Sequence, residues 1–248
     1  MSKTVKSDER LFTIMEALKQ REEAGVTELA KAVDLPKSSV HVHLSTLEKH
    51  DFVVKENGRY SLGLRFLDYG MIARNGRELY DIAKVKVDEL SEKTDEQVWC
   101  ITEENGKAIY LCGGSGEHAI QTDTYVGKQA ELIDLAGGRA ILANLPEPRR
   151  SEIIDGYEFG PESAFSDRET LIETLDTIRS DGIALNTEHY VKGVNAIGAP
   201  IIDNTGRVYG ALSIAGPTHR LKGDFVENEL SDLLLGTTNE IGVNLTYK

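Results

Sequence analysis

The sequence predicts an α+β protein with an N-terminal winged helix-turn-helix, a linker helix and a larger C-terminal α+β domain. One observation is a pair of short segments at helical spacing followed by an Asn-Gly hairpin near residue 57. The other is a set of strand-like segments from residue 98 onward, with helical segments before and after them. At 248 residues and 40% hydrophobic content, the chain can fill two separate cores.

The N-terminal elements follow in order along the chain. A helix is expected over residues 8–23, and Gly25 ends it. Leu29 and Val33 share one face of the next helix, and Asp34-Leu35-Pro36 breaks its periodicity. The following helix carries an apolar stripe at i, i+4 and i+7, formed by Val40, Leu44 and Leu47. This arrangement is typical of a helix-turn-helix whose second helix enters the DNA major groove.

A hairpin completes the winged helix. Strands are expected over residues 52–55 and 59–62, joined by Glu56-Asn57-Gly58, because Asn-Gly is the strongest short hairpin signal. The polar side of the second helix can approach base edges without burying a charge. The candidate DNA contacts are Lys37, Ser38, Ser39, His41, Val42, Ser45, Thr46, Asn57 and Arg59.

These candidates have different expected roles. Lys37 and Ser38 begin the helix, which favours phosphate contacts over base contacts. A solvated helix surface accounts for His41 as well as base readout does, and His43 lies nearer the core edge. Arg59 is placed to reach the minor groove, although an ordinary solvated strand residue is nearly as good an interpretation.

Charge is unevenly distributed. Residues 1–68 hold 11 Lys or Arg and 11 Asp or Glu, so the net charge of −13 lies entirely in the remainder. An acidic far side repels DNA and leaves the neutral end for its approach. The acidity also suits a salt-rich cytoplasm such as that of a halophilic archaeon. Phosphate contacts gain little in concentrated salt, so apolar and base-edge contacts would contribute more of the affinity.

The rest of the chain predicts a linker helix over 64–76 and an α+β domain over 77–248, after a winged helix over 1–63. The linker comprises a helical stretch over 64–74 and the punctuating Asn75-Gly76. Ser166, with Glu169 three residues on, resembles a capping box, and Pro146 and Pro148 are expected to stop a helix. Helices are expected over 78–93, 136–144, 167–180 and 224–244, and strands over 98–103, 107–112, 119–124, 183–185, 194–202 and 207–214.

Several function classes are excluded by what the sequence lacks. No apolar run is long enough to cross a bilayer, and no signal peptide is evident, so a cytoplasmic protein without membrane contact is expected. Cys100 and Cys112 fall in neighbouring strands, where a contact is conceivable and buried free thiols are favoured. Gly113-Gly114-Ser115-Gly116 departs from a nucleophile elbow at Glu117. His118 and His189 lack partners at metal-ligand spacing, so neither an enzyme nor a metal or cofactor site is predicted.

Five separated segments resemble the IclR family of transcriptional regulators over nearly the full length, and their order matches as well. The first two match the start of the recognition helix and the end of the wing, and the other three resemble a helix start and two strand segments of the second domain. They are Leu35-Pro36-Lys37-Ser38-Ser39-Val40-His41, Gly58-Arg59-Tyr60-Ser61-Leu62-Gly63, Ala136-Gly137-Gly138-Arg139-Ala140-Ile141-Leu142, residues 182–200 and Ala211-Leu212-Ser213-Ile214-Ala215-Gly216-Pro217.

The resemblance implies a GAF-like effector-binding domain behind the winged helix. It also implies a homodimer or homotetramer, joined through the first helix and the linker helix, on a roughly palindromic operator in double-stranded DNA. Effectors in the family are small organic acids or aromatic and sugar breakdown products. By position, the effector site comprises Ala130, Leu132, Ile133, Leu135, Ala136, Gly137, Asn186, Val194, Ala196, Ser213 and Ala215.

Departures from the family pattern alter the expected ligand. Ile133 and Leu135 replace a frequent His and hydroxyl residue, and Asn186 replaces an acidic one. Glu131 and Asp134 would oppose a small anion unless they point outward. A larger, partly apolar or neutral ligand is therefore expected. The alternatives are a ligand-independent regulator, or a sensor or scaffold protein that acts through protein contacts.

Overall fold

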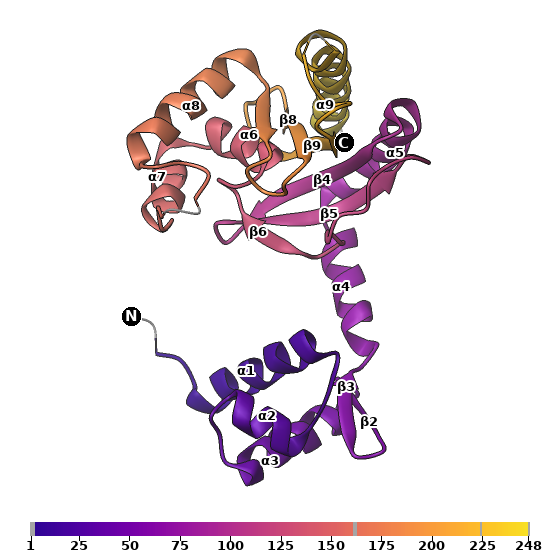
Figure 1. The fold of residues 1–248 in the computed structure, drawn as a ribbon, viewed down its shortest axis with the longest axis vertical. Coiled ribbons are helices and arrows are strands. Elements are labelled where there is room, and N and C mark those ends of the chain that lie inside the picture. The colour runs from indigo at the N-terminus through magenta and orange to yellow at the C-terminus, as the bar shows by residue number, and fades with distance from the viewer. Residues whose placement is uncertain (1–2, 161–162, 224, 248) are drawn as a thin grey trace. The chain divides into compact units, whose positions relative to one another are not determined.

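The computed structural model describes residues 3–160, 163–223 and 225–247, which form two compact units, Met1–Ala73 and Arg74–Lys248 (Figure 1). The first unit contains three helices and a three-stranded antiparallel sheet of order β1-β3-β2, with a fourth helix, α4, starting in it. Its elements are α1 Lys6–Arg21, β1 Glu23–Gly25, α2 Val26–Ala32, α3 Lys37–Lys49, β2 Val53–Glu56, β3 Arg59–Leu62 and α4 Arg65–Asn75.

The winged helix has the predicted core and one unpredicted strand. Val40, Leu44 and Leu47 of α3 are buried against α1 and α2, as their spacing predicts. Asn57 and Gly58 adopt positive φ angles of 49° and 81°, which the tight turn requires. The addition is β1, whose three residues pair with β3; they are too short to show a period in the sequence.

The first turns of helix α4 contact the winged helix, and the side chains of α4 are not buried by the rest of the chain. Phe52 packs against Phe66 and Tyr69, with ring centroids 4.8 and 5.4 Å away. Arg65 donates to the carbonyl oxygen of His50 at 2.9 Å. None of the 11 residues of α4, all of which the structure describes, is buried within this chain.

The second unit is built on a six-stranded antiparallel sheet of order β6-β5-β4-β9-β8-β7 (Figure 1). Apolar residues of α5 and α9 pack on one face, and residues of α6, α7 and α8 pack on the other. The elements are α5 Glu78–Thr94, β4 Gln97–Glu104, β5 Lys107–Ser115, β6 Gln129–Glu131, α6 Ala136–Asn144, α7 Glu147–Asp155, α8 Arg168–Asp181, β7 Ala184–Thr187, β8 Val194–Ile202, β9 Val208–Pro217, a π-helical turn Phe225–Leu230 and α9 Ser231–Thr246.

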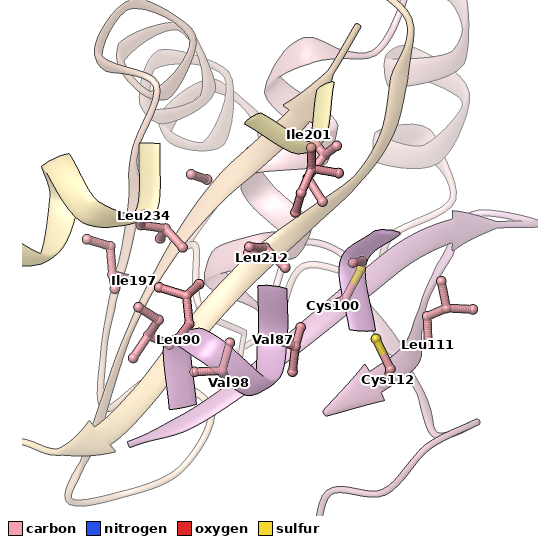
Figure 2. Packing of buried hydrophobic residues seen from close by; sticks show 14 of the residues in the cluster. Val87, Leu90, Val98, Cys100, Leu111, Cys112, Ile197, Ile201, Leu212 and Leu234 are labelled. Carbon is pink, nitrogen blue, oxygen red and sulfur yellow. The ribbon is translucent and has the colours of Figure 1, made fainter. Parts of the chain in front are cut away.

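Figure 2 shows the core under α5 and α9, including the two cysteines. Cys100 of β4 and Cys112 of β5 are direct register partners, and both are buried free thiols, as the sequence analysis favours. Val87 and Leu90 of α5 pack with Ile197 and Leu212 of the sheet in the same cluster. Alternation along the strands sends the intervening side chains to the opposite face.

One predicted strand is wrong, and one helix beside the sheet was not predicted. Residues 119–124 form no strand; the strand next to β5 is β6 instead. The segment 119–124 is held by side chains, since Thr122 donates to Gln97 Oε1 at 2.9 Å and Arg220 donates to the carbonyl oxygen of His118 at 3.0 Å. Pro146 and Pro148 end α6 but also begin α7, because a proline fits the first turn of a helix.

The starts of two later helices also differ from expectation. Asp167 rather than Ser166 caps α8, accepting a hydrogen bond from the Thr170 N–H at 2.9 Å. Ser166 instead donates to the Asp167 carboxylate at 2.7 Å. The C-terminal helix begins at Ser231 after the π-helical turn, and Asp224, its predicted start, lies outside the described residues.

The first turn of α6 approaches the sheet closely enough to require glycine. A Cβ at Gly198 of β8 would lie 2.4 Å from the Gly137 amide nitrogen. A Cβ at Gly138 would lie 2.2 Å from the Leu132 carbonyl oxygen. Backbone atoms cannot yield by rotating a side chain, so any larger residue at these positions displaces α6.

Replacing Gly198 with alanine is therefore expected to lower the free energy of unfolding by about 1–3 kcal/mol, the usual cost of overpacking. Urea denaturation followed by circular dichroism measures this loss. Gly236→Ala in α9 is the matched control, because a Cβ there meets nothing within 4 Å. It is expected to stabilise the helix by roughly 0.5–1 kcal/mol. Equal midpoints for the two variants would contradict the close contact.

Candidate functional site

The exposed face of α3 holds most of the predicted DNA contacts. Within this chain, Lys37, Ser38, His41, Ser45 and Thr46 are exposed, and Ser39 is half-buried. Val42 lies at the middle of this face with 64% of its surface exposed. The Thr46 hydroxyl donates to the Val42 carbonyl oxygen at 3.0 Å, so its methyl group is left for outward contacts. Asn57 is exposed at the tip of the hairpin.

Arg59 has a different surrounding from the one predicted. Its Nε lies 2.7 Å from Glu23 Oε1, and its Nη2 lies 3.1 Å from Glu28 Oε2. The pKa of Glu28 is lowered first by the Gly25 N–H and then by Arg59. Arg59 therefore ties β3 to β1 and α2, and it would have to leave two carboxylates to reach a DNA groove.

The second unit contains a cavity of about 550 Å³, counting its mouth, on the face of the sheet that α6 covers. Strands β4, β5, β7, β8 and β9 supply one side, and the start of α6 supplies the other. Two loops, around residues 122–124 and 190–191, complete it. The lining residues are Gln97, Trp99, Ile101, Tyr110, Thr122, Thr124, Leu135, Ala136, Gly137, Asn186, Tyr190, Val191, Val194, Ala196, Ser213 and Ala215.

Eight of the 11 residues predicted for the effector site line this cavity. They are Leu135, Ala136, Gly137, Asn186, Val194, Ala196, Ser213 and Ala215. The other three do not. Leu132 and Ile133 are buried in the apolar core around α6, and Ala130 pairs with Ala108 in the sheet.

The prediction missed the contribution of β4. Gln97, Trp99 and Ile101 alternate along that strand and share a face with Ser213 and Ala215 of β9, to which β4 is paired. The alternation is visible in the sequence, but the strand order that sets β4 beside β9 is not. Thr122, Thr124, Tyr190 and Val191 lie on loops, whose paths have no periodic signal.

Asn186 lines the cavity, and its amide is already occupied. Its Nδ2 donates to the Asp134 carbonyl oxygen at 2.7 Å, and its Oδ1 accepts from the His189 N–H at 3.0 Å. The buried amide thus joins the loop before α6 to the loop after β7. A residue expected to contact the ligand instead fixes the two segments between which the cavity lies.

The lining carries no ionisable acid or base other than tyrosine. Among the lining residues, all within the described part of the chain, none is Asp, Glu, Lys, Arg or His. Glu131 pairs with Lys107, and the Asp134 carboxylate accepts from the Tyr157 hydroxyl at 2.8 Å. Burial raises the pKa of Asp134. Both acids flanking the start of α6 therefore have partners outside the cavity.

The start of α6 is the main source of positive potential here. Its first N–H groups lack partners within the helix, and a helix end stabilises an anion by at most about 2 kcal/mol. Removing a carboxylate from water costs several kcal/mol. The cavity as built therefore favours an uncharged occupant over an anion.

A buried cation anchors the loop before α6. Arg139, 1% exposed, donates to the carbonyl oxygens of Ile133 at 2.9 Å and Leu185 at 2.6 Å. Its guanidinium also lies 5.4 Å from the centre of the Phe165 ring. Burial lowers the pKa of Arg139 to about 10, which leaves it protonated at neutral pH. Arg139 thus connects α6, the loop and β7.

An ion pair anchors the loop that carries Thr122 and Thr124. Glu96, 3% exposed, accepts from Arg220 Nε at 2.6 Å and from Arg220 Nη2 at 2.8 Å. Arg220 also donates to the His118 carbonyl oxygen, and Asp95 accepts from the His118 N–H at 3.0 Å. These contacts hold the segment that carries Thr122 and Thr124 over the cavity.

Across residues 3–160, 163–223 and 225–247, no three His, Cys, Asp or Glu side chains are grouped to hold a metal ion. None of the helices in those ranges is both long and apolar enough to cross a membrane.

A winged helix carried on the same chain as a separate α+β domain is an architecture of transcriptional regulators. Two family models match this chain: the IclR helix-turn-helix domain over residues 8–57, and the bacterial transcriptional regulator IclR C-terminal domain over residues 73–243. The chain belongs to the IclR family of transcriptional regulators. It is therefore a member of a family of regulators rather than enzymes, as the sequence analysis predicts.

Relatives and solved structures agree with this assignment. A probable HTH-type transcriptional regulator ArcR of Halobacterium salinarum is 33% identical over 94% of this chain and 90% of its own length. The regulator KdgR of Escherichia coli is 27% identical over 98% of this chain and 94% of its own. The Thermotoga maritima IclR structure is 27% identical, with a TM-score of 0.77 over 98% of both chains.

A further structure shares the fold at lower identity. It is an IclR homologue from Microbacterium hydrocarbonoxydans, complexed with 4-hydroxybenzoate. The two chains are 19% identical, with a TM-score of 0.78 over 96% of this chain and 98% of that one.

The role of Arg139 predicts a large loss of stability when its hydrogen bonds are removed. Arg139→Met leaves two buried carbonyl oxygens without donors, and the free energy of unfolding is expected to fall by about 2–4 kcal/mol. Arg139→Lys keeps one charged donor and is expected to lose less. Urea midpoints measure both. A methionine variant as stable as the unchanged protein would show that Arg139 is not an anchor.

Proposed function

We propose that this protein is a sequence-specific DNA-binding regulator whose operator affinity changes when a small metabolite occupies the cavity of the second unit. The exposed face of α3, with small polar residues around Val42, is the observation that carries the DNA-binding part. This face offers the methyl groups of Val42 for apolar contacts and the hydroxyl groups of Ser45 and Thr46 for hydrogen bonds with base edges. Family membership supports the same conclusion.

The effector part of the proposal is supported by the cavity. It lies within one unit and has apolar walls with a few polar groups, which is the composition typical of small-molecule sites. The Microbacterium homologue was solved with a small organic molecule, so the shared fold accommodates one in that protein. An effector alters operator affinity only if it binds two arrangements of the regulator with different affinity.

The proposal includes DNA binding in concentrated salt. The acidic excess outside the winged helix and the relative from Halobacterium salinarum support a saline host. Salt weakens contacts with phosphate far more than apolar contacts. Val42 at the centre of the α3 face fits that condition.

The proposal also includes self-association through α4. Leu67 and Ile72 expose 60% and 68% of their surface in the single chain, and Leu64 exposes 85%. Uncovered apolar side chains on one short helix are typical of a protein interface. A two-fold symmetric dimer would present two copies of α3 to a roughly palindromic operator.

One observation supports a second function. Val42 is a large apolar side chain in solvent, and such a residue also suits docking onto another protein. In that case the chain would be a sensor or scaffold without DNA affinity. Selection of bound sequences from random duplex DNA, in low and in multi-molar KCl, distinguishes the two functions. A palindromic motif enriched in both supports a regulator, and no enrichment in either supports the scaffold.

Val42→Glu tests the α3 face directly. A carboxylate pressed against DNA phosphates and base edges is expected to weaken binding to the selected motif by more than about a hundredfold. Fluorescence anisotropy with labelled motif DNA measures the affinity. Val85→Glu on α5 is the control, because Val85 is similarly exposed, at 57%, in the other unit. Undiminished affinity of the Val42 variant would exclude α3 as the recognition helix.

A double substitution tests the α4 interface. Leu67→Glu combined with Ile72→Glu places charges at two uncovered apolar positions of α4, and sedimentation velocity at micromolar concentration is expected to show a monomer. Operator affinity is expected to fall with it, because one molecule no longer engages two half-sites. An unchanged oligomer would exclude this helix from the interface, and Val85→Glu again serves as the control.

A further inference from the structure

We infer that the cavity takes an uncharged small molecule that accepts a hydrogen bond from the indole N–H of Trp99. This inference rests on the proposed function of the cavity as the effector site, and it adds the ligand class and the residue that selects it. It is carried by one buried donor without a partner, by the hydrogen bonds that Gln97, Thr122 and Thr124 make with one another, and by the lack of charge in the lining.

Trp99, one of the residues that line the cavity, has a buried donor without a partner. Its side chain lines the cavity and is 91% buried, yet Nε1 has no hydrogen-bond partner among the described residues. The opposite edge of the ring lies over Gly113, where a Cβ would come within 2.4 Å of Cζ3. Because Nε1 is on the other side of the indole, it faces away from Gly113.

The register of the sheet defines what lies around Trp99. Trp99 is paired with Gly113 of β5 on one side and with Ser213 of β9 on the other. The ring leans over the glycine, which alone leaves room for it. The edge with Nε1 is thereby on the side of the ring away from Gly113, and Ser213, the register partner on β9, also lines the cavity.

Three polar side chains of the lining, those of Gln97, Thr122 and Thr124, already pair with one another. Thr122 donates to Gln97 Oε1 at 2.9 Å, and its hydroxyl lies 3.0 Å from that of Thr124. The Trp99 donor is outside this chain of hydrogen bonds. A buried donor left without an acceptor is costly, so an oxygen supplied by a ligand is a favourable partner.

The absence of charge in the lining selects against ionised ligands. The acids beside the start of α6 have partners outside the cavity, and no side chain of the lining supplies a cation. The helix start alone does not offset the loss of hydration of a carboxylate. Trp99 and Tyr110, edge to face with centroids 5.2 Å apart, form an aromatic wall suited to a flat apolar body.

The test uses three probes of the same shape: benzamide, benzoate and toluene. Benzamide is neutral with an oxygen acceptor, benzoate is charged, and toluene has no acceptor. The full chain contains one tryptophan, so its fluorescence reports occupancy at Trp99 directly. Benzamide is expected to bind at least about tenfold more tightly than either of the other two, the usual value of one buried hydrogen bond. Tighter or equal binding of benzoate, or binding of none of the three, overturns the inference.

The role of the donor is tested without disturbing the fold. In a ¹H–¹⁵N spectrum the single indole N–H gives one signal, which is expected to move downfield with benzamide and much less with toluene. Trp99→Phe, followed by calorimetry, is expected to lower benzamide affinity about tenfold and leave toluene affinity nearly unchanged. A loss that is equal for both probes, or an unmoved indole signal, would show that Trp99 only shapes the cavity.

A separate readout distinguishes this inference from the proposed function. The affinity for the selected DNA motif is measured with and without saturating benzamide. If benzamide binds as expected but the protein selects no motif, the proposed function fails and the ligand class holds. If a motif is selected while benzoate is the preferred probe, the proposed function as a regulator is supported and the inference of an uncharged ligand is wrong.

Discussion

The close contact between the first turn of α6 and strand β8 determines the shape of the second unit. Gly198 lets the backbone of β8 meet that of α6, because a Cβ at this position would lie 2.4 Å from the Gly137 amide nitrogen. The helix start is thereby held beside β4 and β9, and the space that remains between them becomes the cavity. Protein interiors are densely packed, so a helix displaced by even one methyl group would alter both the core and the cavity. Cavity geometry and stability therefore depend on the same contact.

Buried polar side chains then hold the loops, which lack the regular backbone hydrogen bonds of strands and helices. Arg139 joins the loop before α6 to β7, Asn186 joins that loop to the one after β7, and the Glu96–Arg220 pair holds the segment near residue 118. Such groups are costly when unpaired, so each allows few alternatives for the backbone that it contacts. The cavity is thus surrounded by loops with specified paths, which a ligand site needs if it is to be largely preformed.

The sequence predicts periodic features well and the consequences of three-dimensional pairing poorly. The stripe of Val40, Leu44 and Leu47 is visible because a helix repeats every 3.6 residues, and the structure buries all three. The sequence does not predict the ion pairs of Arg59, because its partners Glu23 and Glu28 are more than 30 residues away. They come close to Arg59 only when β1 pairs with β3. Trp99 was missed for a similar reason, since only the order of the sheet places β4 beside β9. Eight of the 11 residues carried over by position line the cavity, whereas the residues contributed by β4 and by the loops were not predicted.

The two proposed sites share one physical character. At the proposed DNA-binding surface, the centre of the α3 face is the apolar Val42. Arg59, which lies in the hairpin, is paired with Glu23 and Glu28 of its own domain. On the ligand side, the cavity offers aromatic walls and a directed N–H donor instead of a charge. Apolar contacts and short hydrogen bonds lose little strength when salt screens charges, whereas ion pairs at a surface lose most of theirs. A regulator with a strongly acidic second domain, working in concentrated salt, would keep both DNA affinity and effector response only if neither depended on long-range attraction. The charge balance of the chain and the chemistry of both sites are consistent with that single requirement.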